Sequence, residues 1–141
     1  MATAEKPTLV FVPGAWHPPS CYDIIIKILS SPPYSYPCVA IKTPTVGAEP
    51  PILTLQHDVD AIRAVTTVLA DDGKEILLVM HSYGGLPGSQ SCEELAKNER
   101  ERQGKKGGVI ALVYIAAFVF PEGTIHSTRE TLPPIIDVKV S

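Results

Sequence analysis

Four short runs of apolar residues constrain the fold of this 141-residue chain more than any other feature. The runs are residues 9–12, 39–41, 76–80 and 109–116. None of them alternates with polar residues, and such continuous runs are typical of strands in a parallel sheet, which helices cover on both faces. Segments with helical spacing lie between the runs. Because strand and helix alternate, the sequence predicts a parallel α/β sheet with helices on both faces and right-handed crossovers.

Three helices are expected between these strands. The first covers residues 21–29, the second follows Thr54, whose hydroxyl can cap its first turn, and the third runs from residue 83 to about 102. Basic residues at positions 97–106 are expected to face solvent. The apolar stripe of the first helix is formed by Tyr22, Ile25, Ile26 and Leu29.

Length and charge limit the classes of protein that fit. The chain is 45% hydrophobic and long enough for one core but not two, so residues 1–141 are expected to form one domain, with residues 123–141 as the start of a cap or an irregular tail. Twelve basic against fifteen acidic residues give a net charge of −3, which argues against a nucleic-acid partner. The longest apolar run, residues 109–120, is too short to cross a bilayer, so no membrane association is expected.

The three cysteines, Cys21, Cys38 and Cys92, match neither a metal-binding spacing nor a disulfide framework. We therefore expect reduced thiols and no metal site. No apolar stretch marks a signal peptide at the start of the sequence, and the expected location is cytoplasmic. No glycine-rich phosphate loop is found, and no cofactor is predicted.

The segment that carries chemistry joins the third strand to a helix. The strand at 76–80 runs through His81 into Ser82, and Gly84 and Gly85 follow. A sharp strand-to-helix turn there raises the serine hydroxyl above the carboxyl edge of the sheet, and the helix N-terminus favours a developing oxyanion. This pattern predicts Ser82 as a nucleophile; the alternative is an ordinary turn with a surface serine.

These residues resemble the nucleophile elbow of the alpha/beta hydrolase superfamily, and a second segment strengthens the resemblance. It is Pro13-Gly14-Ala15-Trp16-His17, after the first strand. A third segment, residues 112–123, is similar to the branch that contains small-molecule methyl-ester hydrolases and hydroxynitrile lyases. The alternative interpretations are a Pro-Gly turn for the second segment and an ordinary buried strand for the third.

The resemblance implies a partial alpha/beta hydrolase fold of about four strands, with the last strands absent. It assigns the backbone amides of Ala15 and Tyr83 to an oxyanion hole. Met80 stands where the family has a small residue, which leaves open how the elbow accommodates it. The substrate-contacting residues that the resemblance implies are Gly14, Trp16, His17, His81, Ala117 and Phe118.

A serine nucleophile needs a histidine base, and the base needs a carboxylate that orients it. In this superfamily both follow the serine in the order acid, then histidine. His126 is the single histidine after Ser82, and Asp137 follows it rather than preceding it. Proximity makes His126 a candidate base, although an exposed loop histidine is the favoured interpretation. The chain therefore looks truncated before its acid and base, and its uncovered sheet edge is expected to self-associate.

Three functions follow from these observations. The first is a carboxylic ester hydrolase acting on a small-molecule ester, with Ser82 as nucleophile and weak activity in this chain alone. The second is an inactive remnant or a module that binds a small ligand or a partner. The third is a hydroxynitrile lyase on the same scaffold.

Overall fold

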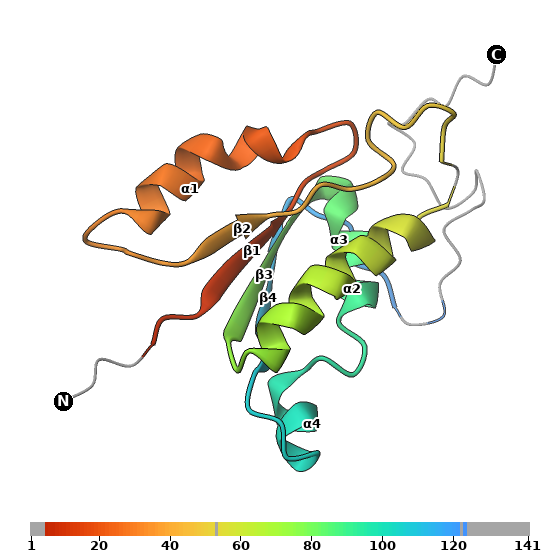
Figure 1. Cartoon of the computed structure of the whole chain (residues 1–141). Helices are drawn as coiled ribbons and strands as arrows, with labels where there is room; N and C mark the ends of the chain where they lie inside the picture. Colours follow the sequence, from red (N-terminus) through yellow and green to blue (C-terminus); the bar gives the residue numbers. More distant parts are fainter. Residues whose placement is uncertain (1–4, 53, 122, 124–141) are drawn as a thin grey trace.

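A computed structural model of the chain describes residues 5–52, 54–121 and 123. Its centre is a four-stranded sheet in the order β2-β1-β3-β4, and every pairing between neighbours is parallel (Figure 1). This architecture confirms the predicted parallel α/β class and its four strands. The strands are β1 (Thr8–Val12), β2 (Cys38–Ala40), β3 (Glu75–His81) and β4 (Gly108–Ile115).

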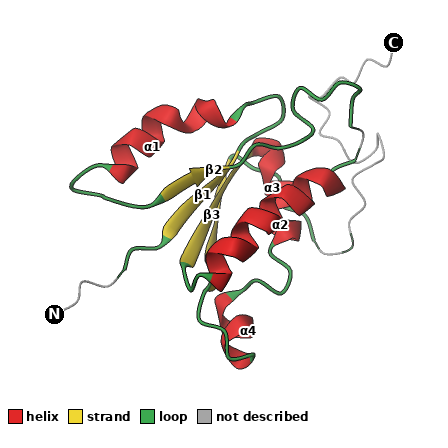
Figure 2. Cartoon of the chain, viewed as in Figure 1, coloured by secondary structure: helices red, strands yellow, loops and turns green. Residues whose placement is uncertain are grey.

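Helices lie on both faces of the sheet, as predicted. In Figure 2, α1 lies on one side of the strands, and α2 and α3 lie on the other. The helices are α1 (Asp23–Ser30), α2 (Gln56–Asp71), α3 (Gly85–Ser91) and α4 (Lys97–Arg102). Short 3₁₀ turns, η1 (Pro19–Tyr22) and η2 (Ser82–Gly84), precede α1 and α3.

Each face of the sheet has its own apolar cluster because successive residues of a strand point to opposite sides. On one face, Val10 and Val12 of β1 pack with Leu78 of β3 and with Ile62 of α2. On the other face, Phe11 of β1 belongs to a cluster that α1 and its preceding turn cover. β1 is buried along its whole length in this way, which agrees with its continuous apolar run in the sequence.

The first helix departs from its predicted stripe. Tyr22, Ile26 and Leu29 pack against the sheet as expected, whereas Ile25 is 39% exposed. At the second helix, the Thr54 hydroxyl accepts a hydrogen bond from the Gln56 amide at 3.1 Å. Thr54 therefore satisfies one of the free amides at the start of α2, as its position in the sequence predicted.

The third helix is shorter than predicted, because the single helix expected over 83–102 is interrupted between α3 and α4. Leu95 lies in this interruption and is buried in the core at 4% exposure. The next residue, Ala96, is extended and forms a parallel bridge with Val109 at the start of β4. Burial of Leu95 and this strand-like contact stabilise a break that helical periodicity alone does not reveal.

The expectation that the basic residues of 97–106 face solvent is wrong for Arg100. Its side chain is 3% exposed. The guanidinium donates to the Gly107 carbonyl at 2.7 Å and pairs with Asp71 at 2.7 Å. A buried guanidinium needs such partners, so Arg100 fastens α4 to the end of α2 and to the chain entering β4.

β4 is an edge strand, and most of its length is uncovered. Five of its large apolar side chains are between 37% and 50% exposed, and they are Ile110, Leu112, Val113, Tyr114 and Ile115. The strand contains no charged residue. Natural edge strands are normally protected by charges, prolines or covering segments, so the described residues leave this edge free to pair.

No helix within the described ranges has the length and apolar character required to cross a membrane.

We expect Ile62→Ala in α2 to lower the free energy of unfolding by about 2–5 kcal/mol, because it leaves a cavity between the helix and the sheet. Ile62 is 0% exposed, whereas Val68 on the same helix is 63% exposed. The matched control Val68→Ala is therefore expected to change stability by less than about 0.5 kcal/mol. Urea denaturation measures both; equal losses would contradict the assigned face of α2.

Candidate active site

The turn between β3 and α3 places Ser82 at the carboxyl end of a central strand. Ser82 has φ of 50°, in the left-handed region, and begins the 3₁₀ turn that leads into α3. A non-glycine residue in this region costs on the order of 1–3 kcal/mol and persists only where its surroundings hold it. The strained serine between strand and helix is the local geometry that the sequence predicted for a nucleophile elbow.

Gly84 lets the elbow lie against the end of β1. A Cβ at this position would come within 2.7 Å of the Pro13 carbonyl oxygen and 2.8 Å of the Val12 carbonyl oxygen. Both contacts are to backbone, which cannot move away as a flexible side chain would. Only glycine therefore allows β1 and the elbow to approach this closely.

The segment after β4 holds the elbow from the other side. The Phe118 amide donates a hydrogen bond to the Ser82 carbonyl at 3.1 Å. A Cβ at Gly85 would overlap the Phe118 carbonyl oxygen and lie 3.1 Å from the Ala117 Cβ. Ala117 and Phe118, predicted to contact substrate, thus lie directly beside the elbow, where their backbone supports Ser82.

Met80, two residues before Ser82, fits beside the elbow because Gly88 makes room for it. Met80 is 0% exposed. A Cβ on Gly88 would lie 2.5 Å from the Met80 sulfur and 2.8 Å from its Cγ. Since α3 presents no side chain here, the larger residue is accommodated inside the core. Ser82 retains its left-handed backbone.

The loop after β1 lies against the nucleophile. A Cβ on Gly14 would be 3.3 Å from the Ser82 Cβ and 3.0 Å from the His81 Nδ1. The His17 ring donates from Nδ1 to the Ala15 carbonyl at 2.8 Å and meets the His81 ring edge-on, with centroids 6.2 Å apart. Gly14 thus lies against both Ser82 and the His81 ring, and His17 lies beside His81.

Trp16 of the same loop extends into solvent instead. It is 88% exposed, and its φ is 65°. In the part of the chain that the structure describes, the Ala15 amide has no hydrogen-bond acceptor. The role predicted for Ala15, as an oxyanion donor, requires such an unpaired amide.

The side chain of Tyr83 is half-buried and is held by a hydrogen bond. The backbone amide of the same residue is the other predicted oxyanion donor. The Tyr83 hydroxyl donates to Asp58 Oδ2 at 2.9 Å, and Asp58 on α2 is 0% exposed. Burial, followed by the hydrogen bond to Asp58, raises the pKa of Tyr83 well above its ordinary value. Sequence reasoning missed Asp58, although its position four residues before Ile62 and eight before Thr66 places it on the buried stripe of α2.

The predicted base is not located by the structure. His126 and Asp137 lie outside the described residues. Within residues 5–52, 54–121 and 123, no side chain hydrogen-bonds to Ser82 Oγ, and no histidine pairs with a carboxylate. The same residues contain no cluster of three or more His, Cys, Asp or Glu side chains that could hold a metal ion.

Comparison with known proteins agrees with this geometry. The sequence model of the alpha/beta hydrolase family matches residues 9–139. The chain belongs to the alpha/beta hydrolase family. It is 33% identical over 118 residues to "Alpha/beta hydrolase nvfD" of Aspergillus novofumigatus, a match that covers 84% of this chain and 46% of that protein. It is 37% identical over 117 residues to "Probable hydrolase R7" of a Phoma species, covering 81% of this chain and 43% of that protein.

This chain thus spans a little under half the length of the two curated relatives. The residues that the family model matches contain the strand-to-helix turn at Ser82 and the loop after β1. Membership of the family agrees with the four-stranded parallel sheet.

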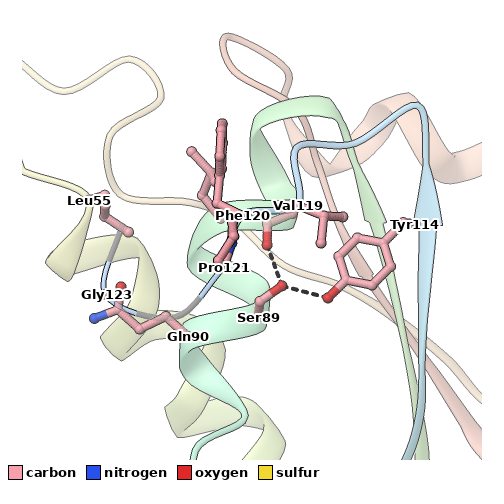
Figure 3. Close-up of a pocket in the computed structure, with 10 residues that line it drawn as sticks. Leu55, Ser89, Gln90, Tyr114, Val119, Phe120, Pro121 and Gly123 are labelled. Carbon is pink, nitrogen blue, oxygen red and sulfur yellow. Dashed lines mark hydrogen bonds between the residues drawn. The ribbon is translucent and has the colours of Figure 1, made fainter. Parts of the chain in front are cut away.

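A pocket of about 500 Å³ opens beside α3, beginning one turn beyond the nucleophile (Figure 3). The Ser89 hydroxyl in its wall hydrogen-bonds to the Tyr114 hydroxyl at 2.7 Å and to the Gly85 carbonyl at 2.6 Å. Ser82 and Ala15 do not line this pocket, so it is a neighbour of the elbow rather than its substrate cavity. Its apolar lining residues include Leu55, Leu86, Val119 and Phe120.

We expect Gly88→Ala to lower the free energy of unfolding by about 1–3 kcal/mol, because the added methyl overpacks the buried Met80 side chain. Combining it with Met80→Ala removes the atoms that clash. The double variant should therefore lose less stability than the sum of the two single variants. Chemical denaturation of all three variants measures this coupling, and strict additivity would contradict the assigned contact.

Proposed function

We propose that this alpha/beta hydrolase carries the nucleophile and oxyanion hole of a carboxylic ester hydrolase that acts on small-molecule esters. The observation that carries the proposal is the strained Ser82 at the end of β3, beside the Gly14–Ala15 loop. The names of the two relatives describe a hydrolase and a probable hydrolase, which supports the reaction class.

In the proposed reaction, Ser82 Oγ attacks the ester carbonyl carbon and forms a tetrahedral intermediate. The amides of Ala15 and Tyr83 stabilise its negative oxygen. The bond to the alcohol then breaks, the serine proton is transferred to the leaving alkoxide, and an acyl-serine remains. Water attacks the acyl-serine, releasing the carboxylic acid and restoring the hydroxyl.

The proton transfers need a histidine base, and His126 is the candidate by sequence order. Enzymes of this type that lack one member of the triad lose on the order of 10⁴- to 10⁶-fold in turnover, while the oxyanion hole retains residual catalysis. If His126 does not act as the base, we therefore expect slow ester hydrolysis, with Ser82 still open to reactive electrophiles.

The second candidate function is binding without turnover. It is favoured by one observation: among the described residues, Ser82 Oγ has no histidine partner. A ligand that binds at Ser82 would then dissociate without being hydrolysed.

Labelling with a fluorophosphonate distinguishes the two functions, because the reagent forms a covalent bond to an activated serine hydroxyl. We expect labelling of the parent protein and its loss in Ser82→Ala. Ser89→Ala is the matched control, since Ser89 lies on α3 two turns from the nucleophile and should label like the parent. Gel fluorescence and mass spectrometry of the labelled peptide measure the result. Labelling that persists in Ser82→Ala would overturn the catalytic proposal, and ligand binding with no labelling would favour the binding function.

We also infer that two copies of this chain pair through β4. The strand is uncharged, and its side chains are exposed on both faces. Two such edges related by a twofold axis would pair antiparallel and extend the sheet across the dimer.

The expected result is a molecular mass by light scattering of twice the monomer value. Val113→Lys combined with Ile115→Lys should return it to the monomer value, because two charges per strand oppose edge pairing. Val68→Lys, on the exposed face of α2, is the control and should leave the dimer intact. A monomeric parent protein would contradict the inference.

A further inference from the structure

Asp58 is the charged side chain that lies deepest beside the elbow. It belongs to the buried stripe of α2, together with Ile62, Thr66 and Ala70, and it is 0% exposed. A carboxyl group in such a place is unfavourable unless its oxygens accept hydrogen bonds. The other residues of this stripe are apolar or weakly polar. The groups that hydrogen-bond to Asp58 therefore explain how a carboxyl group is accommodated there.

Both oxygens of Asp58 are occupied. Oδ1 accepts the backbone amide of Thr45 at 3.0 Å. Oδ2 accepts two hydroxyls, that of Thr45 at 2.6 Å and that of Tyr83 at 2.9 Å. One carboxylate thus joins α2 to two places, the loop that follows β2 and the residue directly after the nucleophile.

We propose that Asp58 is a positioning residue that fixes the backbone amide of Tyr83 for oxyanion stabilisation. The inference rests on the proposed role of Ser82 and adds a residue to it from outside the elbow. Asp58 does not touch the reacting atoms. It acts through the Tyr83 side chain, which among the described residues is the one side chain joining the first turn after Ser82 to α2 by a hydrogen bond.

The elbow needs such an anchor because its backbone is strained. Ser82 has φ of 50°, and Tyr83 lies in a three-residue 3₁₀ turn, which has few internal hydrogen bonds of its own. An oxyanion donor is effective only when its N–H points at the position of the developing charge, and losing one donor costs about 10²- to 10³-fold in rate. Fixing the Tyr83 ring restricts rotation of the peptide that carries this N–H.

The state of the phenol agrees with this role. Burial, and then the hydrogen bond to Asp58, raise the pKa of Tyr83. A tyrosine hydroxyl keeps its proton at neutral pH in any case, and the raised pKa extends to higher pH the range over which it donates to Oδ2.

Two variants test the proposal while leaving the buried carboxylate in place. Each removes one of the two hydroxyl groups that donate to Asp58 Oδ2. Tyr83→Phe removes the bond that leads to the nucleophile. Thr45→Val removes the neighbouring bond to Oδ2 and the interaction of the Thr45 hydroxyl with Tyr83, but it leaves the Thr45 amide on Oδ1 and the Tyr83–Asp58 hydrogen bond in place. Both should lower the midpoint of urea denaturation to a similar extent, since each deletes one buried hydrogen bond.

The rate of fluorophosphonate labelling at Ser82 should separate the variants. We expect the second-order rate constant to fall about tenfold or more in Tyr83→Phe, and to stay within about twofold of the parent in Thr45→Val. Equal rates in the two variants, or no change in Tyr83→Phe, would overturn the positioning role.

A second measurement does not depend on reactivity. The ¹⁵N order parameter of the residue 83 amide should fall from about 0.85 toward about 0.6 in Tyr83→Phe and remain near 0.85 in Thr45→Val. If the parent protein is not labelled at Ser82, the proposed function fails. The order parameters then still decide whether Asp58 immobilises this amide, and unchanged values in Tyr83→Phe would refute it.

Discussion

Close backbone packing around Ser82 is the constraint on which the rest of this structure depends. The carboxyl ends of β1, β3 and β4 meet there, with Gly84 against the carbonyls of β1 and the Phe118 amide bonded to the Ser82 carbonyl. Each contact is made by main-chain atoms whose positions follow from parallel strand pairing. The strained backbone of Ser82 is therefore maintained by the packing of the sheet around it.

The described residues contain the groups to which the proposal assigns the nucleophile and the oxyanion donors, on β1, β3 and the turns that follow them. The candidate base, His126, lies outside the described residues. Amide preorganisation and general-base catalysis contribute separately to rate, so the two parts of the proposal can be tested separately. A chain spanning under half the length of its relatives combines the proposed site with the uncovered apolar edge of β4.

Local patterns predicted much of this arrangement. The four strands, the cap at Thr54 and the turn at Ser82 all follow from residues close in sequence. The features that local patterns predicted wrongly depend on contacts with residues distant in the sequence. The expected long third helix is broken because Leu95 enters the core and Ala96 meets Val109. Arg100 is buried because Asp71 and the Gly107 carbonyl accept its hydrogen bonds.

By itself, the sequence determined the fold class and the strand-to-helix turn at Ser82, because unbroken apolar runs are typical of parallel strands and glycines permit a tight turn. Only the tertiary structure decided how Met80 fits, since its space is provided by Gly88 on the following helix. It also decided that Asp58 on α2 binds Tyr83 on the elbow, 25 residues away. Such contacts arise when helices pack on the sheet, and periodicity within one segment does not specify which side chain lies opposite.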